Sequence, residues 1–232
     1  MVEVCGHRGC AGIEPENTMR GFKKAIESGA EYVGADVRMT KDKELVLIHD
    51  SSVDRTTNGH GPVRSYEMKE LLTLDAGRNE RIPNLLELYY LMKQTGIKVE
   101  LEIKEPDTVK SIISFVRKQK ISDMVILSSL WHDILKGIKE KHPGLVTGAV
   151  LLCRPVDPVS LAKDCGVDYL LMNCEYVDED LVYECHSNDI RLIVNADFPE
   201  DILRMIRLGV DMINTDYPDI AVEIRERLRK PR

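Results

Sequence analysis

An alternation of short apolar runs with helical segments is the feature that most constrains how this chain folds. From Ile82 onward, each apolar run is followed by a stretch whose apolar residues recur at helical spacing. Repeated strand–helix units place their strands in parallel, and this many units in one chain favour a closed sheet. The pattern therefore predicts an α/β fold, a TIM (β/α)8 barrel. The expected strands are 99–104, 124–128, 145–151, 168–172, 190–195 and 211–214, and the expected helices are 84–95, 107–119, 131–141, 158–165, 178–187 and 199–208.

The N-terminal part of the chain supplies three more strand candidates. One apolar run ends at Gly6, a helix is expected at about 15–28, and two further apolar runs cover 32–37 and 45–50. The candidates then number nine, one more than an eight-stranded barrel needs. One of the two runs at 32–37 and 45–50 is therefore expected to be an excursion from the barrel.

These two runs predict a hairpin, because the polar stretch between them leaves no room for a helix. With the turn centred on Asp42-Lys43, Asp36 is expected to face His49 across the hairpin. A slip of one residue would change this register and turn every side chain of the strand to the other face.

Residues 51–80 interrupt the alternation, because they are rich in turn-forming residues and contain only one short helix candidate. We expect a small insertion after the third strand, lying over the active end of the barrel and not forming a separate domain. Residues 1–232 are then one domain, a length that is common for α/β barrels.

Composition excludes several classes of protein. Hydrophobic residues make up 43% of the chain and charged residues 31%, which is typical of a folded globular protein. The net charge of -7, with no basic face, argues against a nucleic-acid partner. The six cysteines match no zinc spacing, and neither a signal peptide nor a bilayer-spanning run is evident. Reduced thiols, a cytoplasmic location and no stable membrane insertion are expected.

Titratable and cationic side chains stand where two early apolar runs end. The first run ends in Gly6-His7-Arg8-Gly9, and another ends in His49-Asp50. A lone His-Arg pair is more often a surface turn, but barrels carry their chemistry at the carboxyl ends of strands. Two imidazoles suit an acid and a base on opposite sides of a reacting group, and an arginine fork suits phosphate oxygens.

The run from Glu100 to Lys104 alternates charged and apolar residues, so positions 100, 102 and 104 share one face of a strand. In a strand covered on both sides, that face points to the lumen or mouth, where carboxylates need a nearby cation. The alternative is an edge strand whose charged face lies in water. Candidate hard oxygen ligands for Mg²⁺, Ca²⁺ or Mn²⁺ are Asp36, Glu102 and Glu100.

Together, a base, an acid, a metal and two cations, Arg8 and Lys104, predict cleavage of a phosphate ester. The remaining polar candidates are interpreted as structural. Asp216 is expected to cap the helix that follows the last strand, and Trp131 either lines the mouth or packs at a helix start. The other histidines are interpreted as surface residues: His60, His132, His142 and His186.

In this order, the motifs resemble those of the glycerophosphodiester phosphodiesterase family. The resemblance implies a TIM barrel that hydrolyses glycerophosphodiesters to sn-glycerol 3-phosphate and an alcohol with a divalent cation. It implies attack on phosphorus by the neighbouring glycerol hydroxyl, and a cyclic intermediate that water opens. It also implies an acid/base pair (His7 and His49), metal ligands (Asp36 and Glu102) and phosphate contacts (Arg8 and Lys104). The similar segments are His7–Gly9, Pro15–Thr18, Asp36-Val37 with Thr40–Asp42, Val46–Asp50, Arg55–Gly59, Ile82-Pro83, Leu101–Lys104, Ser128-Ser129 and Thr215–Pro218.

Two segments depart from the family pattern. Gly34 stands where the family usually has the first carboxylate of Glu-x-Asp-Val, so one expected metal ligand is missing. Residues 194–197 stand where Trp-Thr-x-Asn is usual. Fewer carboxylates weaken divalent binding, so we expect a weakly bound metal, with Glu100 or Asp197 compensating.

Two alternatives to a glycerophosphodiesterase remain open. The first is a barrel that binds a phosphodiester or glycerol phosphate without turnover, which Gly34 favours. The second is a lysophospholipase D-like enzyme, whose pocket Val194 would open. The presence of both His7 and His49 favours an enzyme, because a binding protein has no need of two imidazoles.

Overall fold

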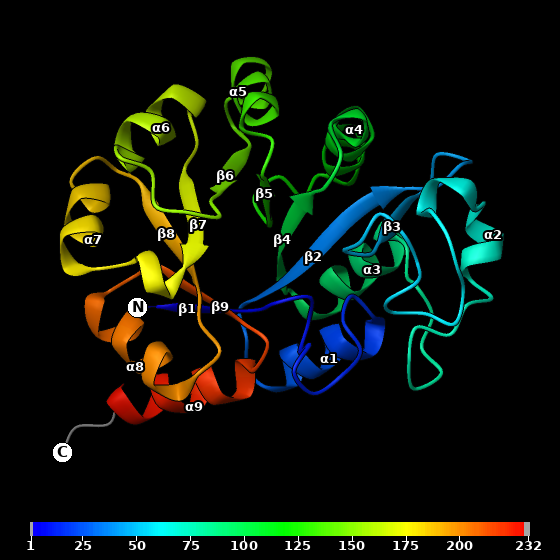
Figure 1. Ribbon diagram of the computed structural model, residues 1–232, viewed down its shortest axis with the longest axis horizontal. Coiled ribbons are helices and arrows are strands. Elements are labelled where there is room, and N and C mark those ends of the chain that lie inside the picture. The colour runs from blue at the N-terminus through cyan, green and yellow to red at the C-terminus, as the bar shows by residue number, and fades with distance from the viewer. Residues whose placement is uncertain (1, 230–232) are drawn as a thin grey trace.

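Eight parallel strands close into a barrel in the computed structural model, which describes residues 2–229 (Figure 1). The strand order is β1-β9-β8-β7-β6-β5-β4-β2, and pairing of β1 with β2 completes the ring. The prediction of a TIM barrel is therefore confirmed. The barrel strands are β1 (Glu3–Gly6), β2 (Tyr32–Met39), β4 (Lys98–Ile103), β5 (Val125–Ser129), β6 (Val146–Val150), β7 (Tyr169–Asn173), β8 (Arg191–Asn195) and β9 (Met212–Thr215).

Helices surround the barrel, one after almost every strand (Figure 1). Their ends follow local sequence signals. Asn84 caps α3 together with Glu87, aspartates cap α6 and α7, and left-handed glycines such as Gly96 end three of the helices. The helices are α1 (Met19–Glu27), α3 (Leu85–Thr95), α4 (Val109–Gln119), α5 (His132–Lys141), α6 (Pro158–Cys165), α7 (Glu179–His186), α8 (Pro199–Leu208) and α9 (Pro218–Arg229), with short 3-10 turns η2 (Pro106–Thr108) and η3 (Cys174–Tyr176).

The ninth strand, β3 (Leu45–Leu47), is the excursion. It pairs antiparallel with the end of β2, outside the ring. Val37 pairs with Leu47, and the amide of Ile48 donates to the carbonyl of Asp36 over 3.0 Å. The expectation that Asp36 faces His49 was therefore wrong by one residue.

The turn explains this shift of register. Thr40 and Glu44 close the hairpin through a 3.0 Å backbone hydrogen bond, so three residues form the loop and not two. The third of them, Lys43, has φ +69°, the left-handed conformation that a three-residue hairpin loop needs. Such loops usually carry glycine there, and a lysine gives no signal for it.

The segment after β3, residues 48–84, holds the 3-10 turn η1 (Val63–Ser65) and the short helix α2 (Met68–Leu71), and lies beside the barrel next to β3 (Figure 1). The carboxylate of Asp42 accepts from the amide of Met68 over 3.0 Å and so ties this segment to the hairpin. The segment and β3 share a small apolar cluster of their own: Val46, Ile48, Val53, Val63, Met68, Leu71, Ala76 and Ile82.

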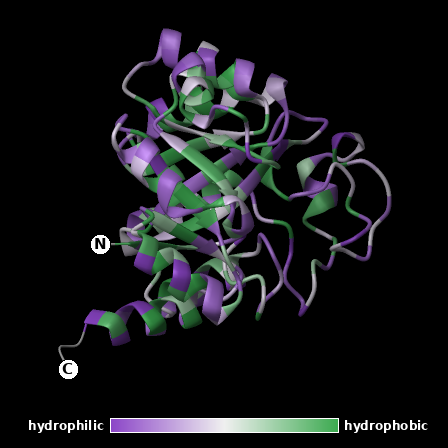
Figure 2. Ribbon diagram, turned by 60° about the vertical axis from the view of Figure 1, so that its left-hand side comes forward, coloured by the Kyte–Doolittle hydropathy of each residue, from purple (hydrophilic) through white to green (hydrophobic). Residues whose placement is uncertain are grey.

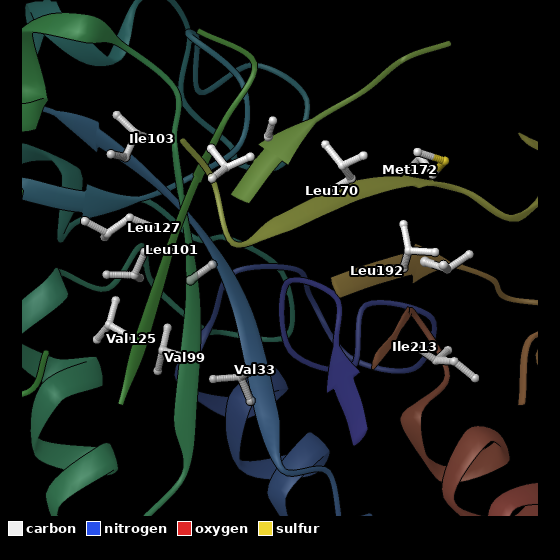
Figure 3. Packing of buried hydrophobic residues seen from close by; sticks show 14 of the residues in the cluster. Val33, Val99, Leu101, Ile103, Val125, Leu127, Leu170, Met172, Leu192 and Ile213 are labelled. Carbon is white, nitrogen blue, oxygen red and sulfur yellow. The ribbon is translucent and has the colours of Figure 1, made fainter. Parts of the chain in front are cut away.

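Alternate residues of the barrel strands serve two different layers. One set, including Val33, Leu101 and Leu127, packs outward against the helices (Figure 3). The other set points into the lumen, where Tyr32, Tyr169 and five more residues fill the lower part of the barrel. Figure 2 shows the resulting mixture of apolar and polar residues along the strands. Toward the carboxyl ends the lumen residues become polar, and this polar layer forms the mouth.

We predict that Lys43→Gly raises the free energy of unfolding by about 0.5–1 kcal/mol, because relief of the left-handed strain exceeds the entropic cost of glycine. Lys41→Gly, in the same exposed turn but without a positive φ, is the control and should lower it by about 0.5–1 kcal/mol. Urea unfolding of the three proteins measures both effects. Equal effects at the two positions would contradict the three-residue turn.

Candidate active site

Two histidines reach the mouth from different strand ends, and each is paired with an aspartate. His7 follows β1, and its Nδ1 lies 2.7 Å from Oδ1 of Asp216, which follows β9. His49 follows β3, and its Nδ1 lies 2.6 Å from Oδ1 of Asp50. About a third of each imidazole is exposed (32% and 33%). Because each carboxylate accepts a hydrogen bond from Nδ1–H, each Nε2 is left for proton transfer.

The surroundings of the two dyads set their charges. Burial alone would lower the pKa of His7, but its hydrogen bond to Asp216 and the charges of Asp216 and Asp36 outweigh burial and the nearby Arg8. The pKa of His7 therefore lies above its ordinary value. A hydrogen bond from Arg55 is the main cause that holds the pKa of Asp50 far below its usual range. Asp50 therefore remains a carboxylate beside His49.

Asp36 is the centre of the charged mouth. Its carboxylate accepts a 2.8 Å hydrogen bond from Nδ2 of Asn17 and lies 3.3 Å from Nε of Arg8 and 3.4 Å from Nζ of Lys104. Lys104 also donates to Oε1 of Glu102 over 2.7 Å. Burial acts to raise the pKa of Asp36, but the two cations and the amide donor have the larger effect, so the pKa lies below its ordinary value. Asp36 is therefore ionised although it is buried.

A chain of ion pairs connects this centre with the second histidine. Nη1 of Arg8 donates to Glu16 over 3.0 Å, and Glu16 accepts 2.7 and 2.8 Å hydrogen bonds from Arg55. Arg55 in turn donates to Asp50 over 2.7 Å. The segment after β3 is thus fastened to the loop after β1, which holds His49 on the same side of the barrel as His7.

Glu100 lies deeper in the lumen than the other carboxylates. It is only 5% exposed and accepts a hydrogen bond from Ser128 on β5. Burial, aided by the charges of Glu102 and Asp36, raises its pKa to about 8. Glu100 pairs in register with Gly34, just as Glu102 pairs with Asp36, so the four positions form a square on the lumen face of β2 and β4.

The structure thus brings the predicted site residues to one end of the barrel: His7, Arg8, Asp36, His49, Glu100, Glu102 and Lys104. Within residues 2–229, however, no three His, Cys, Asp or Glu side chains are arranged as a metal cluster. Trp131 is half exposed and its Nε1 donates to the carbonyl of Lys104 over 3.3 Å, so this tryptophan lines the mouth.

The expected role of Asp216 was wrong, and Asp197 has structural contacts of its own. Asp216, interpreted as a helix cap, has its carboxylate on His7 instead. Asp197, one of two residues expected to replace a missing metal ligand, accepts from Thr215 over 3.0 Å and from the amide of Asp216 over 2.8 Å. Asp197 therefore supports the Asp216 loop, and Glu100 is the carboxylate beside the Gly34 gap.

Several residues that contact the site residues were not predicted from the sequence. Asp216 had a signal, because barrel closure places the end of the last strand beside the end of the first. Glu16, Asn17 and Arg55 stand in motifs that the family resemblance included without assigning them a role. Their role follows from contacts between the loop after β1, the middle of β2 and the segment after β3.

The fold and the mouth define an α/β-barrel protein with two carboxylate-oriented imidazoles beside a cluster of carboxylates and cations. The chain belongs to the glycerophosphoryl diester phosphodiesterase family, whose model matches residues 7–220. This confirms the family indicated by the ordered motifs. Among residues 2–229, none of the helices combines the length and the apolar character needed to cross a membrane.

Relatives of similar length support the assignment. The chain is 36% identical to a glycerophosphodiester phosphodiesterase of Caldanaerobacter subterraneus subsp. tengcongensis, over 95% of this chain and 96% of that protein. It is 32% identical to one from Bacillus altitudinis, over 99% and 100%.

Solved structures agree with the fold. A phosphodiesterase of Oleispira antarctica in complex with the product sn-glycerol-3-phosphate is 25% identical, with a TM-score of 0.90 and coverage of 97% and 96% of the two chains. A structure from Silicibacter pomeroyi, 23% identical with a TM-score of 0.91 over 98% and 94% of the two chains, shares the fold.

We predict that Asp216→Asn lowers the pKa of His7, because it removes the carboxylate that favours the imidazolium. A histidine whose folded pKa is raised adds stability below its unfolded pKa of about 6.5, and this stability is lost as pH rises through the folded pKa. The stability difference between wild type and variant should therefore be largest in acid and shrink above the pKa of His7.

NMR titration of the imidazoles and unfolding at several pH values measure both effects. Asp211→Asn is the matched control, because Asp211 lies at the other end of β9, with Oδ2 2.9 Å from Nε2 of His186, and should leave His7 unchanged. An unshifted His7 in Asp216→Asn would contradict the assignment.

Proposed function

We propose that this chain hydrolyses glycerophosphodiesters to sn-glycerol 3-phosphate and an alcohol, as a phosphoric diester hydrolase. Membership of the family and the names of the relatives support the substrate class. The observation that carries the proposal is the pair of imidazoles, His7 and His49, each oriented through Nδ1 by its own carboxylate. A barrel that only binds phosphodiesters would need neither.

Three carboxylates, Asp36, Glu102 and Glu100, would hold a divalent cation, with Mg²⁺, Ca²⁺ and Mn²⁺ as candidates. Their chemistry fits a hard cation, because they are crowded on adjoining lumen positions and Glu100 has no cationic partner among the described residues. A bound divalent cation would neutralise phosphate oxygens and polarise the phosphoryl group.

Arg8 and Lys104 are the two cations beside Asp36, and we assign them to bind the oxygens of the phosphodiester. Their charges compensate Asp36 and Glu102 in the free protein and would be shared with the phosphate on binding. Trp131, half exposed beside Lys104, forms part of the wall on that side.

The proposed chemistry uses the free Nε2 atoms of both dyads. The glycerol hydroxyl next to the phosphodiester attacks phosphorus while His49 takes its proton, and His7 gives a proton to the departing alkoxide. The raised pKa of His7 suits it to the acid role. Water then opens the cyclic phosphodiester with the roles reversed: His7 takes the proton from water, and His49 returns one to the glycerol oxygen.

A second candidate function, hydrolysis of a lysophospholipid, has one observation in its favour. Large apolar side chains are exposed on the loops after β5, β6 and β8: Trp131, Leu152, Val156 and Phe198. They would suit an acyl chain leaving the mouth. A glycerophosphodiester with a small alcohol group needs no such apolar surface for binding. We therefore retain glycerophosphodiesters as the main substrate class.

We also propose a cytoplasmic location, no nucleic-acid partner and a role in the turnover of lipid-derived phosphodiesters. All six cysteines are free, and five of them are buried, which suits a reducing compartment. The net charge of -7 is unfavourable for binding a polyanion.

We predict that His7→Ala and His49→Ala each lower kcat by about 10²-fold or more, the scale of removing a positioned acid or base. A coupled assay for sn-glycerol 3-phosphate measures this with glycerophosphocholine and glycerophosphoethanolamine, with and without Mg²⁺, Mn²⁺ or Ca²⁺. His60→Ala, with an 87% exposed imidazole, is the control and should keep the wild-type rate.

A parallel reaction with lysophosphatidylcholine tests the second candidate, and we expect glycerophosphocholine to be the better substrate. Full rate in both histidine variants would refute the acid/base assignment. Tight binding of sn-glycerol 3-phosphate by a wild-type protein that turns over none of these substrates would favour the non-catalytic barrel.

A further inference from the structure

Position 34 on β2 faces the lumen between Tyr32 and Asp36, and it holds a glycine that the backbone does not require. Its φ lies outside the left-handed region, so any residue could adopt this conformation. What restricts the position is space. A Cβ added there would lie 3.2 Å from Oε2 of Glu100, its register partner on β4. The carboxylate of Glu100 therefore occupies part of the space of the missing side chain.

A second oxygen points at the same place. Oδ1 of Asn214 on β9 would lie 3.6 Å from that added Cβ. This oxygen is buried and has no hydrogen-bond partner, while Nδ2 of the same amide donates to Asn195 over 2.9 Å. The contact with Asn195 fixes the amide orientation and leaves its oxygen toward Gly34. A buried acceptor without a hydrogen-bond partner lowers the stability of the folded protein. A ligand that binds to this oxygen would recover that free energy.

No positively charged side chain of the described residues pairs with the carboxylate of Glu100. Its Oε1 accepts from the hydroxyl of Ser128. The ammonium of Lys104, which follows β4, pairs with Glu102 and Asp36, and that of Lys98 on β4 lies near Glu3. Two oxygens, one from a carboxylate and one from an amide, thus face a gap that a side chain at position 34 would fill.

We propose that Glu100 and Asn214 are oxygen ligands of a divalent cation in this gap, and that position 34 is a glycine because the gap must stay open. The proposal rests on the proposed function only in placing a cation among these carboxylates. It adds Asn214 to the ligand set, and it makes β4, not β2, the strand that supplies the inner carboxylate. Carboxylate and amide oxygens together are typical of Mg²⁺, Mn²⁺ and Ca²⁺.

The competing explanation is a proton in place of the cation. Protonated Glu100 would donate to Oδ1 of Asn214, and both groups would be satisfied without metal. The two explanations differ in what Gln does at position 100, because a glutamine amide can still donate to Asn214 but brings no charge to a cation.

The test measures Mn²⁺ affinity by electron paramagnetic resonance and the shift in unfolding temperature that Mn²⁺ causes. We expect Glu100→Gln to weaken Mn²⁺ binding about tenfold or more and to abolish most of the Mn²⁺-induced shift, since one of three carboxylates is lost. Asn214→Ala should weaken binding less, by several-fold, since the lost ligand is neutral. Without Mn²⁺, Glu100→Gln should unfold at or above the wild-type temperature, which excludes misfolding as the cause.

The geometry of the gap gives a sharper test through pairs of substitutions. Gly34→Ala should weaken Mn²⁺ binding by pushing the Glu100 carboxylate aside, but should have no further effect in Glu100→Gln, a non-additivity that marks direct contact. Gly34→Glu alone should not improve binding, because its side chain meets Glu100. Combined with Glu100→Gln, it should restore binding toward the wild-type level.

Gly137→Ala is the matched control, because a Cβ at Gly137 on α5 meets nothing within 4 Å. Unchanged Mn²⁺ affinity in Glu100→Gln, or additive effects of Gly34→Ala and Glu100→Gln, would overturn the proposal in favour of the proton. Failure of the proposed function is a separate result. A wild type that hydrolyses glycerophosphocholine without binding Mn²⁺ refutes only the cation site, whereas Glu100-dependent Mn²⁺ binding without hydrolysis refutes only the proposed function.

Discussion

The crowding of three carboxylates at one end of a closed barrel, two of them buried, is the constraint on which the rest of this structure depends. Asp36, Glu100 and Glu102 share the lumen face of two neighbouring strands, where water cannot solvate them fully. Each is stabilised differently: Asp36 by two cations and an amide, Glu102 by Lys104, and Glu100 by a hydroxyl alone. Because of this unequal compensation, the innermost carboxyl, Glu100, is the hardest of the three to ionise, and its pKa rises to about 8.

Closure of the barrel provides the second requirement, because it brings together residues that are far apart in the chain. His7 and Asp216 are 209 positions apart, yet β1 and β9 are hydrogen-bonded neighbours. The excursion of β3 then carries His49 to the mouth, and the Glu16–Arg55 pair holds it there. The two dyads therefore depend on different parts of the fold, one on ring closure and one on the segment after β3.

Much of this architecture could be predicted because periodicity is a local property. Strands and helices after residue 82 follow from alternation, and His7, His49 and the Glu100–Lys104 run follow from polar residues at strand ends or on one strand face. The register of the hairpin could not be predicted, since it depends on a left-handed Lys43 that nothing in the residue type indicates. The role of Asp216 depends on its distance to His7 in space, and a helix-cap pattern at the same position concealed it.

Positions 34 and 100 show why a motif compared along one strand does not by itself describe what a sheet presents to the lumen. When β2 alone is compared with the family pattern, Gly34 stands in place of a metal ligand. Across the register to β4, the same glycine is the space into which the Glu100 carboxylate extends. In a parallel barrel, side chains at the same level of neighbouring strands point into the lumen together. Which charges lie close to one another therefore depends on the register between strands. The carboxylate of Glu100 can therefore extend over β2, because position 34 carries no side chain there.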